Sequence, residues 1–416
     1  MTERGVVRVP GDKSISHRAL ILGSLAEGRS RISGILDSAD VNSTASVLRS
    51  LGVALPDLTS SFAFSGKGLR GLRAPGSALF AGNSGTTVRL MSGVLAAHPF
   101  ASRLEGDASL SRRPMRRIAE PLTAMGARFE FARDDGLPMT IHGGVLSGIS
   151  WNTRAASAQT KSAILLAGLS GGVQVTVIES QKSRDHTERM LTSLGAPVET
   201  QGTTVSLSPV DAIAPVDLTV PGDPSSAAYL VAFAVLGGGA VTIPGVCINP
   251  TRAGFIDTLI EMGARIECGE KSAVAGDAVA TVRATRSSMK DHTVDPSRIA
   301  SMIDELPLLA CVAAASRIAL EVRGAHELRV KESDRIAVVV RNLRAIGVEA
   351  DELEDGFIVR ARSKKLAGRI TTEGDHRIAM SFGVLAALPG SSIDIDDPDC
   401  VSVSYPGFWN DLKSLH

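Results

Sequence analysis

Several short segments bring cationic side chains, hydroxyl groups and glycines together where helices are expected to begin. In Lys13-Ser14-Ile-Ser-His-Arg18 the last residue lies one helical turn after Ser14, so the three polar side chains can reach one anion. A helix N-terminus adds backbone N–H groups and the positive end of the helix dipole. The spacing is not that of a Walker A phosphate loop. Anion binding and an ordinary capped surface helix therefore both stay open.

Three further segments extend this pattern. The Gly-rich turn that ends at Gly85 opens a helix, although glycines in such turns are usually structural. Arg113 belongs to a basic run at a loop-to-helix boundary, and a run of charge is most often a solvated face. Ser157 and Gln159 lead into another helix. Each segment alone is a weak indication, but several such helix starts facing one cleft would bind a densely anionic ligand.

The second half of the chain adds carboxylates to the cations. In Arg329-Val-Lys331-Glu332-Ser-Asp334-Arg335, Glu332 is a candidate acid or base whose pKa its cationic neighbours would set. The alternative is an exposed, salt-bridged helix start. Asp304 and Arg377 stand at two more polar helix starts. No one of these segments decides the function by itself.

Two recurring patterns indicate the elements that position these residues. In the first, a leucine is followed three residues later by a second apolar residue and then by a glycine, which is typical of a helix that ends in a left-handed residue before a strand. It occurs five times, ending at Gly52, Gly126, Gly195, Gly263 and Gly347. In the second, a polar segment leads into an Ala/Gly-rich apolar helix, six times in all. Six units of about 70 residues predict an α/β repeat protein, with chance similarity of Leu-rich helices as the alternative.

Composition narrows the class of protein. A chain of 416 residues is long enough for two domains, and equal numbers of basic and acidic residues (44 each) argue against a nucleic-acid partner. The four cysteines and eight histidines show no metal-ligand spacing, so we expect no metal and a reducing compartment. The uncharged stretch 224–251 is broken by glycines and Pro244, which favours a buried helix and strand over a membrane span. Residues 1–4 begin no signal peptide, so a cytoplasmic protein without a membrane partner is expected.

Taken together, the motifs resemble the 5-enolpyruvylshikimate-3-phosphate synthase family from about Val6 to Trp409. The motifs, in chain order, are PGDKSISHRA, GNSGTTVRL, the Arg-Pro of SRRPM, SAQTKSA, SRDHTE, DELP, RVKESDR and GDHRIAM. The resemblance implies a two-domain inside-out α/β barrel built from six βαβαββ-type repeats. It places one domain at 13–221 and the other at 1–12 with 222–416, with the active site in the cleft between them. A monomer is expected.

The resemblance also implies a reaction and a site. The family transfers the enolpyruvyl group of phosphoenolpyruvate to the 5-hydroxyl of shikimate 3-phosphate and releases phosphate, with no cofactor. Asp304, Glu332, Lys13 and Lys331 match its catalytic positions. The positions that hold shikimate 3-phosphate are matched by Lys13, Ser14, Arg18, Ser157, Gln159, Arg184, Asp304 and Lys331; those that hold phosphoenolpyruvate are matched by Lys13, Gly85, Arg113, Gln159, Arg335 and Arg377. The two substrates carry roughly −5 to −6 together, and seven cations against Asp304 and Glu332 approximately balance that charge.

This chain departs from the family pattern at three positions. Ser404 stands where many relatives have Lys, Glu327 where some have Asn, and Ala158 where a second Ser is common. Gly85 leaves space that Ala fills in relatives insensitive to glyphosate, a competitor of phosphoenolpyruvate in this family, so inhibition is expected.

Two alternatives stay open. The sister transferase that acts on UDP-N-acetylglucosamine typically uses a Cys in a mobile loop of its first large domain, and no Cys precedes Cys247 here. A non-catalytic repeat scaffold that binds anions would give no reason for Asp304 and Glu332 to lie among the cations.

Overall fold

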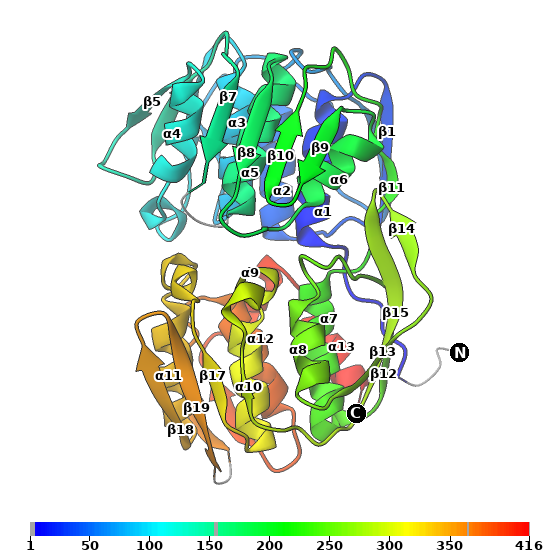
Figure 1. The fold of residues 1–416 in the computed structure, drawn as a ribbon, viewed down its shortest axis with the longest axis vertical. Helices are drawn as coiled ribbons and strands as arrows, with labels where there is room; N and C mark the ends of the chain where they lie inside the picture. The colour runs from blue at the N-terminus through cyan, green and yellow to red at the C-terminus, as the bar shows by residue number, and fades with distance from the viewer. Residues whose placement is uncertain (1–4, 154–156, 364–365, 416) are drawn as a thin grey trace. The chain divides into compact units, whose positions relative to one another are not determined.

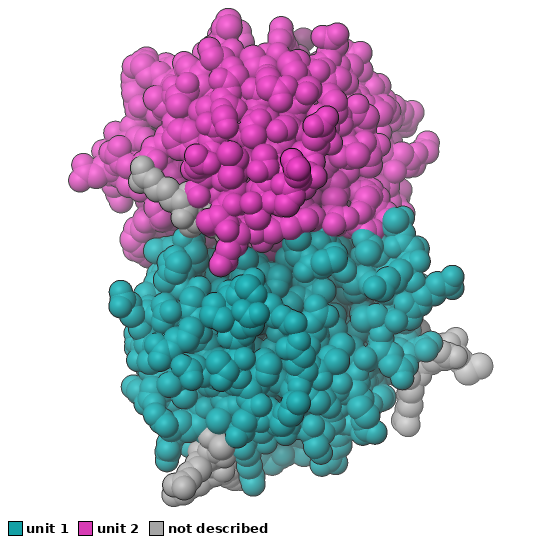
Figure 2. Space-filling view, in the orientation of Figure 1, with its two compact units in different colours: residues 1–10, 221–273, 278–416 teal, residues 11–220, 274–277 magenta. Residues whose placement is uncertain are grey.

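The computed structural model describes residues 5–153, 157–363 and 366–415. Residues 1–4, on which the expectation of no signal peptide rests, lie outside the described residues. The chain forms two compact units (Figure 2): unit 1 contains residues 1–10, 221–273 and 278–416, and unit 2 contains residues 11–220 and 274–277. No pattern in the sequence had pointed to the short segment 274–277 as part of unit 2.

Unit 2 alternates helices and short strands in a repeating order (Figure 1). Its helices are α1 (Lys13–Leu25), α2 (Ala39–Ser50), α3 (Gly85–Ala96), α4 (Arg116–Ala124), α5 (Ala158–Gly171) and α6 (His186–Ser193), with the 3-10 turn η1 (Leu110–Arg112). Its strands are β1 (Arg29–Ser33), β2 (Ser61–Ser65), β3 (Leu79–Phe80), β4 (Ala101–Glu105), β5 (Arg128–Phe131), β6 (Met139–His142), β7 (Ile149–Asn152), β8 (Val175–Ile178), β9 (Val198–Gln201), β10 (Thr204–Leu207) and β11 (Asp217–Thr219).

Sheet topology in unit 2 repeats the same pairing. The order β3-β4-β6-β5 starts with a parallel pair and continues with two antiparallel pairs, and β7-β8-β10-β9 does the same. In the third sheet β11 pairs in parallel with β1, and β1 pairs antiparallel with β2. A helix separates the strands of the parallel pairs β3-β4 and β7-β8, as a parallel connection requires. The predicted βαβαββ order is therefore present in unit 2.

Unit 1 is built from the same kinds of element. Its helices are α7 (Pro224–Phe233), α8 (Gly254–Glu261), α9 (Ile299–Met302), α10 (Leu306–Ser316), α11 (Arg335–Ala345), α12 (His376–Ala386) and α13 (Phe408–Ser414), with short helical turns η2 (Ala234–Gly238), η3 (Pro296–Arg298), η4 (His326–Val330) and η5 (Pro398–Val403). Its strands are β12 (Val241–Cys247), β13 (Arg265–Cys268), β14 (Ser272–Val274), β15 (Asp277–Thr285), β16 (His292–Thr293), β17 (Leu320–Val322), β18 (Val348–Leu353), β19 (Gly356–Ser363), β20 (Ala367–Ile370) and β21 (Ser392–Ile395). The turn between β14 and β15, residues 274–277, belongs to unit 2.

The sheets of unit 1 vary this plan. The order β16-β17-β19-β18 repeats the parallel, antiparallel, antiparallel sequence of pairs. The sheet β12-β15-β13 contains antiparallel pairs, and β20-β21 is a parallel pair. Counted over the described residues, the two units hold six sheets, in agreement with the sixfold repeat.

Each unit packs three apolar helices against one another in its interior. In unit 2, α3 contacts both α1 and α5; in unit 1, α7, α10 and α12 contact one another. Nearly all residues of these helices are buried, which is the pattern of a helix in the interior of a domain. Small residues allow the close approach: a Cβ on Gly93 of α3 would lie 2.1 Å from the Ala163 carbonyl oxygen of α5. Several of the candidate residues lie at the polar N-termini of these buried helices, namely Lys13 on α1, Gly85 on α3 and Arg377 on α12.

Glycines end the outer helices, as the sequence pattern predicts. Each lies two residues beyond the last residue of its helix, and φ there is between 86° and 117°. Only a residue without a Cβ adopts this region at low cost. The five are Gly52 after α2, Gly126 after α4, Gly195 after α6, Gly263 after α8 and Gly347 after α11.

The uncharged stretch 224–251 forms the buried helix α7 and the strand β12, as predicted. Within the described part of the chain no single helix is long and apolar enough to cross a membrane. One pair of helical segments, 296–302 and 306–316, passes that test jointly by length and composition, and it is bent by 109°.

Candidate active site

The N-terminus of α1 brings together the first predicted residues. Asp12 caps the helix, its carboxylate accepting from the Ile15 backbone N–H at 2.8 Å. Lys13 is the first residue of the helix, and its Nζ lies 3.0 Å from an oxygen of Asp40. The Ser14 carbonyl accepts a hydrogen bond from Arg18. Lys13, Ser14 and Arg18 therefore share one end of the helix, as their spacing predicts, with a carboxylate that the sequence analysis did not include.

Arg18 is a buried cation, 4% exposed. Its Nε donates to Thr187 Oγ1 at 2.7 Å and its Nη2 to Ser162 Oγ at 2.9 Å, so among the described residues its acceptors are all uncharged. Burial lowers the pKa of Arg18 to about 10, with Glu188 opposing this shift and Arg184 adding to it. A buried guanidinium with another arginine nearby is stabilised by an anion.

Gly85 and Arg113 meet at the start of α3. Ser84 caps this helix by accepting from the Thr87 N–H, and Gly85 is its first residue. The Arg113 guanidinium donates to the Asn83 carbonyl and side-chain oxygens, which holds it beside the same turn. A Cβ on Gly85 would lie 3.5 Å from Arg113 Nη1. The structure thus brings these two predicted residues together.

Arg89 is a functional candidate that the sequence analysis missed. It lies one helical turn after Gly85, it is buried, and its Nη1 donates to Gln159 Oε1 at 2.7 Å. The Gln159 amide in turn donates to Thr86 Oγ1 at 3.1 Å. Arg89 thus joins the starts of α3 and α5. The only available signal was its place within the Gly-rich helix start, one turn after the glycine.

Two polar residues near the start of α5, Ser157 and Lys161, have different roles in the structure. Ser157 caps the helix, its Oγ accepting from the Thr160 N–H at 3.3 Å. Lys161, in the same motif, is 1% exposed and its Nζ lies 2.7 Å from both Glu179 and Glu188. This lysine completes a buried ion triad inside unit 2. It is a structural residue, although it belongs to a motif with two predicted site residues.

Carboxylates surround Arg335 in unit 1. This arginine is 1% exposed. Its guanidinium lies 3.1 Å from Asp304, 2.7 Å from Glu332 and 2.8 Å from Asp375. Burial lowers the pKa of Arg335, but the three carboxylates outweigh this and hold it above its usual value. Lys331 Nζ lies 3.4 Å from Asp304, so four predicted residues of unit 1 form one network.

The network also corrects the charge balance estimated from the sequence. That balance set seven cations against Asp304 and Glu332 alone. Asp40 also neutralises Lys13, and Asp375 also neutralises Arg335. In each of these ion pairs the two residues are in contact in space although they are far apart in the sequence. Arg335 itself is buried, whereas Arg329 and Asp334 of the same segment form a partly exposed ion pair at 2.7 Å, so the alternative of an exposed, salt-bridged helix start applies to that pair and not to Arg335.

Arg377 is another buried arginine of this unit. It follows Asp375, which caps α12 and accepts from the Arg377 N–H at 2.9 Å. Its Nη1 donates to Tyr229 Oη at 3.5 Å, the one side-chain hydrogen bond of this guanidinium among the described residues. Burial opposes the charged form, yet Tyr229, Asp304 and Glu305 outweigh it and raise the pKa of Arg377. Arg377 is therefore positively charged, and its guanidinium can donate further hydrogen bonds to a ligand.

A polar network at the N-terminus of α7 was not predicted. Arg252 is 3% exposed and its Nη2 donates to Ser225 Oγ at 2.7 Å and to Asp223 at 3.2 Å. The Ser225 hydroxyl also donates to Glu305, which is buried. Its members come from three separate segments, so no local spacing could reveal it.

The three residues that depart from the family pattern lie in three different parts of the structure. Ser404 is buried, and its hydroxyl has no partner among the described residues. Glu327 lies half-buried in η4. Ala158 is the first residue of α5, directly after the cap Ser157. A short Ser404 supplies no charge where a Lys would.

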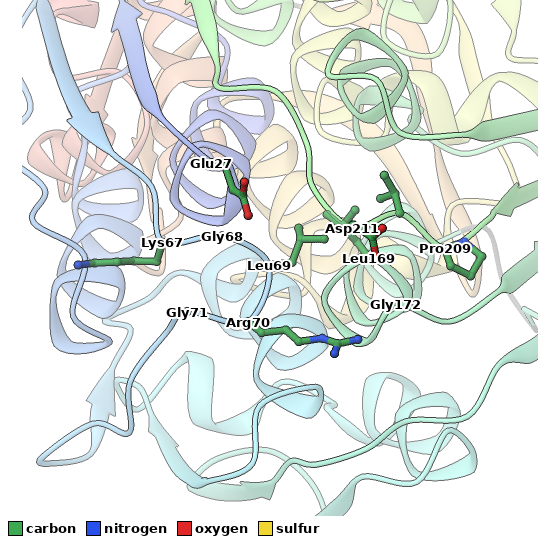
Figure 3. Close-up of a pocket in the computed structure, with 11 residues that line it drawn as sticks. Glu27, Lys67, Gly68, Leu69, Arg70, Gly71, Leu169, Gly172, Pro209 and Asp211 are labelled. Atoms are coloured by element: carbon green, nitrogen blue, oxygen red, sulfur yellow. The ribbon is translucent and has the colours of Figure 1, made fainter.

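A separate pocket of about 360 Å³ lies in unit 2 (Figure 3). Glu27, Lys67, Arg70 and Asp211 supply its charges, and Leu69 and Leu169 supply buried apolar surface. Arg70 donates to the Gly171 carbonyl at 3.0 Å. The lining includes none of the predicted site residues, so this pocket does not belong to the candidate site.

These residues belong to an α/β repeat protein that carries cations at buried helix N-termini in unit 2 and a network of arginines and carboxylates in unit 1. Among the described residues there is no group of three or more His, Cys, Asp or Glu that could hold a metal ion.

Comparison with known proteins gives the family. The family model described as EPSP synthase (3-phosphoshikimate 1-carboxyvinyltransferase) matches residues 2–412, so this chain belongs to that family. A relative named 3-phosphoshikimate 1-carboxyvinyltransferase from Sulfurihydrogenibium sp. (strain YO3AOP1) is 46% identical over 417 residues, covering 99% of this chain and 97% of the relative.

Solved structures agree with this membership. An EPSP synthase from Acinetobacter baumannii matches with a TM-score of 0.85 and 38% identity, covering 98% of this chain and 95% of the other. The enolpyruvyl transferase NikO from Streptomyces tendae shares the fold, with a TM-score of 0.73 and 19% identity over 100% of this chain and 95% of the other. The predicted α/β fold class is confirmed.

Proposed function

We propose that this chain transfers the enolpyruvyl group of phosphoenolpyruvate to the 5-hydroxyl of shikimate 3-phosphate, the reaction named by its family. The observation that carries the proposal is Arg18, a buried cation beside Arg184 whose acceptors among the described residues are uncharged. Such a group needs an anion, and both proposed substrates are polyanions.

In unit 2, we assign most of the substrate-binding donors. Residues proposed to hold shikimate 3-phosphate are Lys13, Ser14, Arg18, Ser157, Gln159 and Arg184, while Lys13, Gly85, Arg113 and Gln159 are proposed to hold phosphoenolpyruvate. Support comes from the helix N-termini of α1, α3 and α5, where most of these residues lie.

Unit 1 supplies the proposed acid and base. Asp304 removes the proton of the 5-hydroxyl, and the oxygen attacks C2 of phosphoenolpyruvate while Glu332 delivers a proton to C3. The tetrahedral intermediate then loses phosphate as a proton leaves the new methyl group, restoring the double bond. Lys331 and Lys13 assist, and Arg335 and Arg377 hold the carboxylate of phosphoenolpyruvate.

Two contacts support this assignment in unit 1. Asp304 lies within 3.4 Å of Lys331, and Glu332 within 2.7 Å of Arg335, so each carboxylate has a cation in place. The reaction moves protons and no electrons, so it needs no redox cofactor. Because the proposed binding and acid–base residues are divided between the two units, the reaction also requires both units, as the proposed domains 13–221 and 1–12 with 222–416, to act on one substrate pair.

We also propose that the protein acts as a cytoplasmic monomer, without nucleic acid or membrane. The zero formal net charge supports the lack of a nucleic-acid partner.

The acceptor determines which transferase this is. Release of phosphate from phosphoenolpyruvate should be measured with shikimate 3-phosphate, with UDP-N-acetylglucosamine and with neither. Release with the first alone is expected. Release with the second would identify the sister reaction, and no release in any mixture would favour an anion-binding scaffold.

A further inference from the structure

Arg18 is held by two hydroxyl groups from two other helices of unit 2. Thr187 lies on α6 and accepts from Arg18 Nε at 2.7 Å; Ser162 lies on α5 and accepts from Nη2 at 2.9 Å. The two hydroxyl oxygens are themselves 2.7 Å apart. These contacts form a closed triangle of three hydrogen bonds among buried side chains.

The triangle restricts how the guanidinium can turn. An arginine side chain has several rotatable bonds, and two acceptors along the Nε–Nη2 edge of the planar guanidinium fix its plane. Nη1 donates to the Ser14 carbonyl at 2.9 Å, which anchors a third corner to the helix that carries Arg18. Both hydroxyl groups are uncharged, so they orient the cation without neutralising it.

A buried ion triad lies beside this triangle. Lys161 Nζ is 2.7 Å from Glu179 and 2.7 Å from Glu188, which follows Thr187 on α6. Two carboxylates and one ammonium leave one negative charge. Glu188 has the largest electrostatic effect in favour of the Arg18 cation. The negative charge that stabilises Arg18 thus acts without a hydrogen bond to it, and no carboxylate among the described residues accepts from the N–H groups of Arg18.

We propose that Thr187 and Ser162 are positioning residues that orient Arg18 for bound shikimate 3-phosphate. This inference rests on the proposed function, because it takes that compound as the ligand of Arg18. The two residues act through Arg18 and do not themselves contact substrate. Either hydroxyl can be removed without changing the charge of the site.

Thr187→Val tests the proposal, because it keeps the side-chain shape and removes the acceptor. We expect the KM for shikimate 3-phosphate to rise about tenfold, as the loss of one hydrogen bond to a charged group implies. The KM for phosphoenolpyruvate and kcat should stay within about twofold. Ser162→Ala should act in the same direction, and Thr187→Ser should restore the KM.

Two controls separate orientation from general damage to the fold. Thr192→Val removes a hydroxyl of the same helix that bonds to a backbone carbonyl, and Thr258→Val removes a buried hydroxyl in unit 1. Neither should alter the KM for shikimate 3-phosphate. In an Arg18→Ala background, Thr187→Val should have no further effect on that KM, because the group it positions is gone.

Direct calorimetric titration with shikimate 3-phosphate keeps the inference separate from turnover. If the wild type binds this compound and Thr187→Val binds it equally well, the positioning role is refuted while the proposed function stands. An additive effect in the Arg18→Ala background, or an equal rise in both KM values, would also refute it. If the wild type neither binds shikimate 3-phosphate nor releases phosphate, the proposed function itself is wrong and the inference falls with it.

Discussion

Replacing Gly85 with alanine tests how the phosphoenolpyruvate side of the site is built. The new Cβ would lie 2.9 Å from Arg89 Nη1, closer than ordinary van der Waals contact, and 3.5 Å from Arg113 Nη1. Arg113 can stay, but Arg89 must move. Since Arg89 is buried and bonded to Gln159 at 2.7 Å, the methyl group should displace the Gln159 amide as well as occupy space.

The size of the effect follows from packing. Forcing a methyl group into a packed site costs about 1–3 kcal/mol, which corresponds to roughly 5- to 150-fold in a binding constant. Glyphosate is longer than phosphoenolpyruvate, so we expect its inhibition constant to rise by this factor. The KM for phosphoenolpyruvate should rise less, and it should still rise because Gln159 is disturbed.

The assay is the inhibition constant of glyphosate against phosphoenolpyruvate for the wild type and Gly85→Ala. Gly144→Ala is the matched control, because a Cβ there would meet no atom within 4 Å. Equal inhibition constants for wild type and Gly85→Ala, or a wild type that already resists millimolar glyphosate, would show that Gly85 does not limit this pocket. An unchanged KM for phosphoenolpyruvate would refute the coupling through Arg89.

Three further predictions concern acid–base chemistry and buried charge. Glu332→Gln and Asp304→Asn should each lower kcat by about 10²-fold or more, in line with the usual contribution of general acid–base groups. Arg18 should lose its charge as pH rises through about 10, so kcat/KM for shikimate 3-phosphate should fall there; Glu188→Gln should move that fall to lower pH, because Glu188 favours the cation. Lys161→Met should destabilise the fold by about 3–5 kcal/mol in urea unfolding, because it leaves two carboxylates buried without their cation.

Each of these has its own control. Near-normal kcat in both carboxamide variants would remove those residues from the mechanism. The pH comparison needs unfolding checked at each pH, since Asp12, Arg184 and Asp277 also influence Arg18; an identical alkaline limb with and without Glu188 would contradict the electrostatic link. Lys182→Met, whose side chain is 47% exposed, should cost far less stability than Lys161→Met, and equal costs would count against the buried triad.

Local sequence was sufficient for the helix ends and the candidate residues. The left-handed turn that ends each of these helices needs a positive φ, and backbone sterics favour glycine there, as at Gly52 and Gly347. Caps such as Ser84 and Ser157 depend on residues three positions away. The motif residues at the starts of α1, α3 and α5 therefore follow from short-range sequence patterns alone.

Packing between distant segments could not be predicted in this way. Arg18 and Thr187 are 169 residues apart in the chain, and Arg89 and Gln159 are 70 apart. Neither pair follows from a helical or strand period. Asp375 lies in the motif GDHRIAM, yet its contact with Arg335 depends on how α11 and α12 pack. The same limit led the sequence analysis to overestimate the net positive charge of the site.

The most direct test of the central claim is a phosphorus NMR spectrum of the protein with shikimate 3-phosphate and phosphoenolpyruvate in equal amounts. The account predicts that both substrate signals fall together, that one free phosphate appears for each phosphoenolpyruvate consumed, and that a new phosphate monoester signal belongs to the enolpyruvyl product. Phosphate that appears equally fast without shikimate 3-phosphate, or substrate signals that stay unchanged with folded protein, would contradict it.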